Sequence, residues 1–403
     1  MIGKSISHQL LSDARRSLIA VLLFFLVVVT GIWISSAFLP TSPGGFPYRE
    51  FALNHSPSPV IRSLANFDGV QYLIIADHDA YYTYQQAYFP LFPILIKGVG
   101  IITGAKLLFA GLMVSVCSLF FGLILLKQLL LLLPGKSSQR WSSVLYLLVI
   151  PGSFFFVSVY TESLFLGLFC GTLLLLHHKH YVLAAITACL LGMTRLVGLF
   201  IMIPMLMYFI YPCLHEKGCT LKKLLQGLKP MHLLVVLSPL IGLLLYMLYL
   251  NITVNDPLAF IHAQRAFNNN RSATIILLPQ VIYRYAKILV TARFDIAYLV
   301  ASLEIGIFAT YITLLARQFH RYFILKKDAH WLSWGLHLFS IANLLLPTLT
   351  GTLSSIPRYG LVSLAVLIEI NQSSRVVKSL LGLIFCLINI LMLALFSQGY
   401  FVS

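Results

Sequence analysis

Long apolar runs with few or no charged side chains dominate the chain. Residues 18–39, 106–133, 182–211 and 380–396 are clear examples. About 18–20 apolar residues suffice for a helix to cross a bilayer, and a helix satisfies its own backbone hydrogen bonds there. Only 10% of the 403 residues are charged, and no polar stretch is long enough to bury a core of its own. The sequence therefore predicts one all-α polytopic membrane domain over residues 1–403.

The distribution of basic residues predicts the orientation of this domain. Lys4, Arg15 and Arg16 precede the first apolar run and indicate a cytoplasmic N-terminus. The first helix then delivers residues 40–100 to the extracytoplasmic side as a long loop, in which residues 61–76 are expected to form an interfacial amphipathic helix. Continued alternation of apolar runs and basic loops predicts about eleven membrane-spanning helices, among them residues 142–156 and 361–370.

One apolar run is too long for a single straight crossing. Residues 182–211 make up about 30 residues, which suits two short crossings that meet outside the membrane. Thr194 and Arg195 interrupt this run near its middle. An arginine at that depth is costly unless it is paired or faces a cavity, so we expect Arg195 to have a functional partner.

The net charge of +16 does not indicate nucleic-acid binding in a chain of this kind. Lys and Arg concentrate in the loops assigned to the cytoplasm, where they set orientation and contact anionic headgroups, and no nucleic-acid motif is present. The cysteines show no CxxC or metal-like spacing. We therefore predict no disulfide framework. Cys213 and Cys219 flank a Lys-rich loop, and the other four cysteines fall within apolar runs.

The segment from 66 to 97 differs from the rest because it combines carboxylates with aromatic residues. Asp68, Asp77 and Asp79 lie here, just before a run that contains Pro90 and Pro93. Carboxylates so close to a membrane need water, a partner or a function. An ordinary loop with solvated acids, or an Asp68 that caps a helix, would also account for them. Asp68 with Asp77 or Asp79 could supply oxygen ligands to a divalent cation, although nothing in the spacing requires one.

Other unusual polar residues are predicted on the same extracytoplasmic side. Acids and arginines gathered at one membrane face suit a negatively charged lipid substrate and a reaction that needs a base. Glu162 could instead favour a helix start by its charge alone, and Arg358 could anchor the chain at the interface. With Asp77 and Asp79, the predicted substrate-binding residues are Tyr72, Glu162, Arg195, Asp256, Gln264, Arg265, Arg358 and Tyr359.

Six short motifs from about residue 66 to 359 carry a resemblance to a known family. In order, they are Phe67-Asp68-Gly69 with Tyr72, residues 87–93 (AYFPLFP), residues 160–165 (YTESLF), Thr194-Arg195, residues 256–260 (DPLAF) and Pro357-Arg358-Tyr359. With these motifs the chain resembles the PIG-V-like mannosyltransferases, which include GPI mannosyltransferase II and shorter prokaryotic relatives. Phe67 stands where that family more often has Trp, which keeps an aromatic ring.

The resemblance implies a GT-C glycosyltransferase that uses a polyprenyl-phosphate sugar, usually dolichyl-phosphate mannose. It places Asp68 at the position of the catalytic acidic residue in the first external loop, with transfer to a glycolipid, glycan or protein acceptor. The membrane would be the plasma membrane in a prokaryote or the endoplasmic reticulum in a eukaryote. A polytopic transporter or flippase, or a non-catalytic membrane subunit, would also need many spans and a few buried charges.

Overall fold

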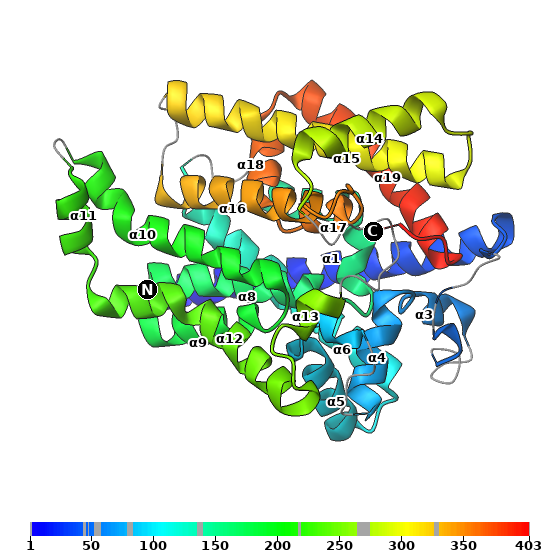
Figure 1. Cartoon of the computed structure of the whole chain (residues 1–403). Coiled ribbons are helices and arrows are strands. Elements are labelled where there is room, and N and C mark those ends of the chain that lie inside the picture. The colour runs from blue at the N-terminus through cyan, green and yellow to red at the C-terminus, as the bar shows by residue number, and fades with distance from the viewer. Residues whose placement is uncertain are drawn as a thin grey trace.

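The computed structural model describes residues 2–42, 46, 48–51, 58–78, 84–134, 140–216, 219–263, 275–325 and 330–402. Regular secondary structure in these ranges is helical throughout (Figure 1). Six helices there are long and apolar enough to cross a membrane, which confirms the all-helical character and agrees with a polytopic membrane protein. These six are Gln9–Phe38 within α1 (Ile2–Phe38), α6 (Leu107–Leu131), Leu196–Leu214, α12 (Pro230–Val254), Ile296–Ile324 with α15 (Ile296–Phe319), and α19 (Arg375–Ser397). The helix α16 (Trp331–Thr348) also has 18 residues but is not one of the six.

Shorter helices fill the space between the long ones. The α-helices among them are α4 (Asp68–His78), α5 (Leu91–Thr103), α7 (Arg140–Leu147), α8 (Glu162–His177), α9 (Tyr181–Gly192), α10 (Met202–His215), α11 (Leu221–Gly227), α14 (Leu278–Thr291) and α18 (Leu364–Gln372). The shortest elements are α3 (Pro59–Ser63), η1 (Gln85–Ala87), η3 (Ser153–Val157), η4 (Leu196–Ile201), α13 (Ala259–His262), the π-helical turn η6 (His320–Ile324) and α17 (Ile356–Gly360). In Figure 1 the N-terminus and α11 lie at one end of the molecule, and α4 and α5 lie toward the other.

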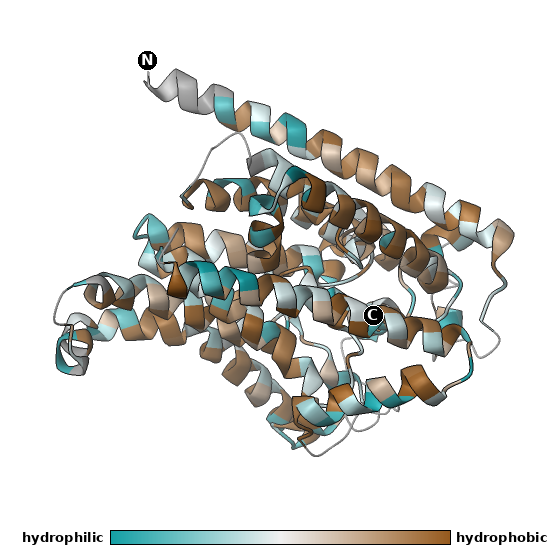
Figure 2. Ribbon diagram, turned by 90° about the horizontal axis from the view of Figure 1, so that it is seen from above, coloured by the Kyte–Doolittle hydropathy of each residue, from teal (hydrophilic) through white to brown (hydrophobic). Residues whose placement is uncertain are grey.

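The outer surface of the bundle is apolar where the long helices face outward. On α1, Leu22, Leu23, Leu26 and Val27 are all more than half exposed. Figure 2 shows that hydrophobic residues cover most of this helix after its N-terminal part. In water such a surface would be unfavourable, whereas lipid tails are as apolar as these side chains. The surface therefore fits a bilayer.

Two glycines let α9 and α12 approach until their backbones touch. A Cβ atom added at Gly242 would lie 2.1 Å from the carbonyl oxygen of Cys189, and one at Gly192 would lie 2.3 Å from that of Pro239. Close approach at small residues is a common way for helices to associate in membranes. This contact fixes the C-terminal end of α9, where the apolar run breaks.

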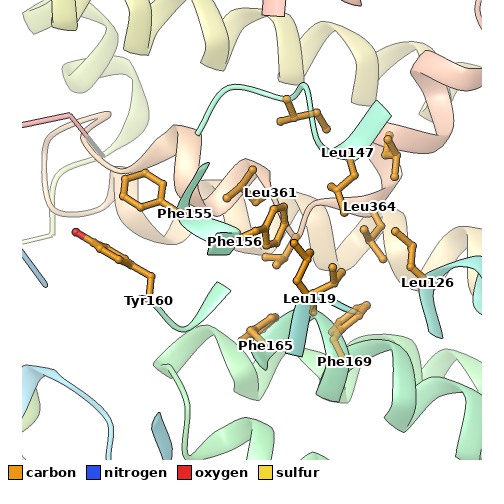
Figure 3. Close-up of a cluster of buried hydrophobic side chains, with 14 of the residues drawn as sticks. Leu119, Leu126, Leu147, Phe155, Phe156, Tyr160, Phe165, Phe169, Leu361 and Leu364 are labelled. Carbon is orange, nitrogen blue, oxygen red and sulfur yellow. The ribbon is translucent and has the colours of Figure 1, made fainter. Parts of the chain in front are cut away.

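A buried aromatic layer links the middle of the chain to its C-terminal part. Figure 3 shows Phe155 and Phe156 from η3 with Phe165 and Phe169 from α8, close to Leu361. All five side chains are at most 1% exposed. The layer forms one wall of the polar cluster described below.

The predicted break at Thr194-Arg195 is confirmed in position: α9 ends at Gly192, and η4 begins at Leu196. The predicted interfacial helix over 61–76 is instead divided into α3 and α4 by turns at residues 64–67. The predicted span 142–156 also differs. It contains the short helix α7, then a turn in which Gly152 has a φ of +85°, then η3. Pro151 lacks the N–H that would continue the helix.

The predicted span 361–370 corresponds to α18, which is buried on all sides from Leu364 to Ile370. Its nine residues extend only about 14 Å at 1.5 Å per residue, which is shorter than a hydrocarbon core of about 30 Å. This helix is enclosed by protein, so it does not need the length of a lipid-exposed crossing.

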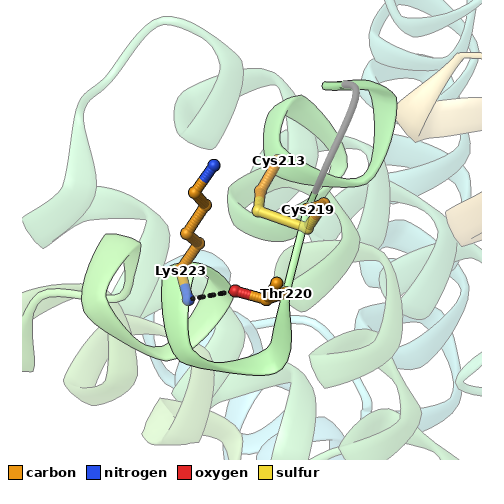
Figure 4. Close-up of a disulfide and its surroundings, with 4 residues drawn as sticks. All are labelled: Cys213, Cys219, Thr220 and Lys223. Atoms are coloured by element: carbon orange, nitrogen blue, oxygen red, sulfur yellow. Dashed lines mark hydrogen bonds between the residues drawn. A yellow bond between two sulfur atoms is a disulfide. The ribbon is translucent and has the colours of Figure 1, made fainter.

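The sequence predicted no disulfide framework, but the structure contains one disulfide. Cys213, in the last turn of α10, is bonded to Cys219, with their Cα atoms 5.7 Å apart (Figure 4). The chain turns back after the helix, which brings the two cysteines within bridging range. The spacing of six residues matches no common cysteine motif, so the sequence did not indicate the pairing. Cys117, Cys170, Cys189 and Cys386 are free.

Candidate functional site

Four charged side chains from distant parts of the sequence form a continuous chain of ion pairs. Arg358 Nη1 donates to Asp68 Oδ2 at 2.5 Å, and Arg358 Nε donates to Glu162 Oε1 at 2.9 Å. Arg195 Nη1 donates to the same Glu162 oxygen at 2.7 Å. The chain of ion pairs therefore runs from Asp68 through Arg358 and Glu162 to Arg195, and acidic and basic residues alternate along it. The structure brings these four residues together, as the sequence predicted. The direct ion pairs between the arginines and the carboxylates were not predicted.

Burial differs sharply along this chain of ion pairs. The side chain of Glu162 is 0% exposed, and those of Arg358 and Arg195 are 8% and 12% exposed. Asp68 is the most accessible member, at 26%. Glu162 Oε2 and the neighbouring Thr161 Oγ1 are buried without a hydrogen-bond partner among the described residues. A ligand that entered the cluster would therefore meet Asp68 first, with the arginines behind it.

The turn before α4 positions Asp68. The Asn66 side chain donates to the carbonyl oxygen of Phe396 at 2.8 Å, and the carbonyl oxygen of Asn66 accepts from the Tyr160 hydroxyl at 2.8 Å. Phe67 has a φ of +57°, an uncommon conformation for a bulky residue. Its ring packs 5.8 Å from that of Phe396, centroid to centroid. Held in this way, the chain enters α4 with Asp68 as its first residue.

Glu162 begins α8, and its position follows from the helix start. A carboxylate in the first turn is favoured by the helix dipole, as expected for the capping alternative. The side chain also accepts hydrogen bonds from two arginines, which neither the helix-dipole interpretation nor the substrate-binding interpretation had predicted. Because a buried carboxylate without partners would be very costly, the arginines account for its presence in the interior.

Arg195 lies in the extended segment between α9 and η4, with a φ of −161°. The backbone N–H of Leu91, at the start of α5, donates to the carbonyl oxygen of Met193 at 3.1 Å and ties the two segments together. The guanidinium of Arg195 stacks over the Tyr359 ring at 5.0 Å. Tyr359, which was predicted to bind substrate, therefore contacts the cluster through this ring.

Arg358 is held by α17, in which Gly360 allows close packing against α15. A Cβ at Gly360 would lie 2.2 Å from the Tyr311 ring. The guanidinium of Arg358 lies 4.7 Å from the Tyr160 ring centre and 5.2 Å from that of Phe155. Burial alone would lower the pKa of Arg358, but the carboxylates of Glu162 and Asp68 outweigh it and raise the pKa. Arg358 is therefore a permanent cation.

Tyrosines complete the surroundings of Asp68. Tyr88 donates its hydroxyl to Asp68 Oδ1 at 3.1 Å. Burial, and then the Asp68 carboxylate, raise the pKa of Tyr88, so that it remains a donor. The predicted residue Tyr72 is buried edge-on against Tyr88, and burial raises its pKa as well. Tyr246 of α12 fixes the segment by donating to the carbonyl oxygen of Gln86 at 2.8 Å.

An apolar cavity is lined by segments that adjoin those of the cluster, although none of the four charged cluster residues belongs to its wall. It has a volume of about 490 Å³, within the range typical of ligand sites. Ile75 and Ala76 of α4 line it, together with Pro93 of α5, Met193 next to the helix break, and Tyr246. Lys97 is the one charged residue in its wall. The cavity therefore shares α4 and the helix break with the charged cluster.

Two predicted site residues do not join the cluster. Asp77 is exposed, and its described ion-pair partner is His78, at 3.7 Å. Asp256 accepts from His262 at 2.7 Å and from the backbone N–H of Leu258, so its contacts are local to the turn before α13. The hydrogen bond from His262 lowers the pKa of Asp256. The motif that contains Asp256 still lies near the site, because the ring centre of its Phe260 is 5.7 Å from that of Phe89.

The remaining predicted residues, Asp79, Gln264 and Arg265, lie outside the described residues. Among the described residues, no group of three or more His, Cys, Asp or Glu side chains is arranged to hold a metal ion. The pairing that was considered between Asp68 and Asp77 is not formed, because Asp68 faces Arg358 while Asp77 is paired locally.

The sequence-based prediction did not include Tyr88 and Tyr160 among the site residues. Tyr88 is 20 residues from its acceptor Asp68, a separation without a periodic pattern. Tyr160 directly precedes the Thr161-Glu162 pair, so its position next to a predicted site residue was the available indication. Both were part of the quoted motifs, where they had been assigned no contact.

Comparison with known proteins adds no relative: no family model matches the chain, and neither a curated protein nor a solved structure matches it.

Proposed function

We propose that this protein is a glycosyltransferase that moves a sugar, most simply mannose, from a polyprenyl-phosphate donor to an acceptor hydroxyl. The observation that carries the proposal is the chain of ion pairs from Asp68 to Arg195, together with an apolar cavity lined by adjoining segments. A donor of this class has a phosphate, a sugar and a long apolar chain. The arginines suit the phosphate, the aromatic residues suit the sugar, and the cavity suits the first part of the chain.

Asp68 acts as the general base in this proposal. The acceptor oxygen forms a bond to the anomeric carbon while the bond from that carbon to the phosphate oxygen breaks, which inverts the anomeric centre. The hydroxyl proton passes to Asp68, and the bonding electron pair leaves with the phosphate. Tyr88 and Arg358 each occupy one lone pair of Asp68, and a carboxylate has about four acceptor sites, so room remains for the hydroxyl. A positioned base of this kind contributes about 10²- to 10⁴-fold.

Arg358 and Arg195 stabilise the charge that develops on the leaving phosphate. Each guanidinium has five N–H donors, and the observed contacts with Glu162 and Asp68 use one from Arg195 and two from Arg358. Glu162 keeps both arginines oriented before the substrate arrives. Such fixed donors need little rearrangement when charge appears, which is an important source of electrostatic catalysis.

With this function we propose an architecture of the GT-C type with about eleven crossings. The six long apolar helices would be part of that set, and shorter helices would supply the rest. The active site then faces the extracytoplasmic or lumenal side, in line with the excess of basic residues in the loops at the other side.

Sugar transfer in membranes supplied with radiolabelled polyprenyl-phosphate mannose tests the proposal. We expect wild type and Asp77→Asn to label a product, since Asp77 is exposed and outside the cluster. Asp68→Asn keeps the shape but removes the base, and should lower transfer by about 10²-fold or more. Equal transfer by all three proteins would exclude Asp68 as the base. No transfer by any of them, with each shown to be folded, would refute this donor class.

A further inference from the structure

A second cavity, which is lined by charged side chains, lies where α15 passes into the π-helical turn η6, opposite α18. Its volume is about 440 Å³, and its wall includes Arg317, His320, Arg321 and Glu369. In Figure 1 the end of α15 and the start of α16 lie at the end of the molecule that carries the N-terminus, away from α4. This cavity is therefore separate from the Asp68 cluster. The orientation predicted from the sequence places it at the cytoplasmic membrane edge.

The cavity has an excess of positive charge. Glu369 Oε1 accepts from Arg321 Nη2 at 2.8 Å, and Arg317 Nε lies 3.8 Å from the same oxygen. One carboxylate thus faces two guanidinium groups. Arg321 also donates to Gln372, which fixes it, whereas the Arg317 side chain is 50% exposed. Arg317 therefore retains donors for an anion, because a guanidinium has five N–H groups.

A second, independent feature is the other oxygen of Glu369. The side chain is 0% exposed, yet Oε2 has no hydrogen-bond partner among the described residues. A buried carboxylate oxygen without a donor is unfavourable by about 1–3 kcal/mol or more. A ligand that brought both a phosphate and a hydroxyl donor would satisfy the arginines and this oxygen together.

The surroundings favour a lipid over a free anion. Leu325 belongs to the wall of the cavity, and Phe319 and Phe323 on the same turns are 43% and 62% exposed. Apolar side chains next to an anion site suit acyl chains. The inner leaflet also presents anionic headgroups at this depth, and each basic residue near them contributes about 1 kcal/mol.

We propose that this cavity binds the headgroup of an anionic phospholipid that carries a hydroxyl donor, as phosphatidylglycerol does. The phosphate contacts Arg317 and His320, and the headgroup hydroxyl donates to Glu369 Oε2. The proposal is independent of the function proposed for the Asp68 cluster.

Native mass spectrometry of the purified full-length chain in detergent, titrated with phosphatidylglycerol, tests this assignment. Phosphatidylmethanol, which has the same negative charge but no headgroup hydroxyl, should bind more weakly to the wild type, a comparison that needs no variant. Arg317→Gln should weaken phosphatidylglycerol binding about fivefold, whereas Arg375→Gln, an exposed arginine at the start of α19, should not.

Three outcomes would overturn the proposal. The first is equal binding of the two lipids by the wild type. The second is an equal effect of the substitutions at Arg317 and Arg375. The third is inorganic phosphate that binds as tightly as the lipid and with the same dependence on Arg317, which would assign the cavity to a free anion.

Discussion

Replacing Glu162 by Gln tests whether the chain of ion pairs determines the stability of the fold. The substitution keeps the size of the side chain and removes the negative charge shared by Arg195 and Arg358 at 2.7 and 2.9 Å. Because the Glu162 side chain is 0% exposed, water cannot replace the lost carboxylate. Removing one partner of a buried ion pair typically lowers the free energy of unfolding by about 3–5 kcal/mol. We expect a loss in that range.

A second substitution distinguishes the loss of charge pairing from a loss of packing. In Glu162→Gln, Arg358 still has the carboxylate of Asp68, whereas Arg195 loses the charged partner that the described residues give it and keeps its stacking on Tyr359. Arg195→Gln should therefore cost less in the Glu162→Gln background than in the wild type. We expect a coupling free energy of about 1–3 kcal/mol, typical of residues in one network.

The assay is reversible unfolding in mixed micelles, followed by circular dichroism. Asp256→Asn is the matched control, because it removes an acid from an exposed pair with His262 and should change the free energy by about 1 kcal/mol at most. The reasoning would be refuted if Glu162→Gln were no more destabilising than this control. Simple additivity of the substitutions at Glu162 and Arg195 would show that the shared carboxylate oxygen is not what couples them.

Three further outcomes follow from other contacts. Gly242→Ala should destabilise the fold by more than about 1 kcal/mol in the same unfolding assay, since the new Cβ would lie 2.1 Å from a carbonyl oxygen. Gly98→Ala is the control and should not destabilise the fold, because its new Cβ would have nothing within 4 Å. Equal effects of the two substitutions would contradict the close packing of α9 against α12. Maleimide labelling of the denatured, unreduced chain should modify four of the six cysteines, and labelling of all six would exclude the bond between Cys213 and Cys219. If Asp68 is the base, Tyr88→Phe should lower sugar transfer about tenfold, because a hydrogen bond to a charged group contributes about 1.5–3 kcal/mol. Unchanged transfer would show that Tyr88 does not position Asp68.

The sequence was most informative where membrane physics leaves few alternatives. The length of the run over 182–211, with an arginine inside it, predicted the break at Thr194-Arg195 that separates α9 from η4. The expected cost of a buried charge also indicated that Arg195 has a partner, which proved to be Glu162. These predictions depend on local composition, and the structure bears them out.

Contacts between distant segments could not be predicted in the same way. Asp68 and Arg358 are 290 residues apart, so no spacing reveals that they pair, and the arginines were expected to face a substrate rather than carboxylates. Asp77 resembled Asp68 in sequence but lies near the other end of α4, where it is exposed. The bond between Cys213 and Cys219 depends on how the chain turns after α10, which composition does not determine.

The order in which the charges are synthesised has a consequence for biogenesis. Glu162 enters the membrane with α8, 33 residues before Arg195 and 196 residues before Arg358. Until α17 arrives, Asp68 lacks its arginine, so the growing chain carries a carboxylate that only its C-terminal part can neutralise. A chain interrupted before residue 356 would keep that charge unpaired. The charge of Asp68 is therefore paired only when the chain has been synthesised through α17 and has folded back onto α4.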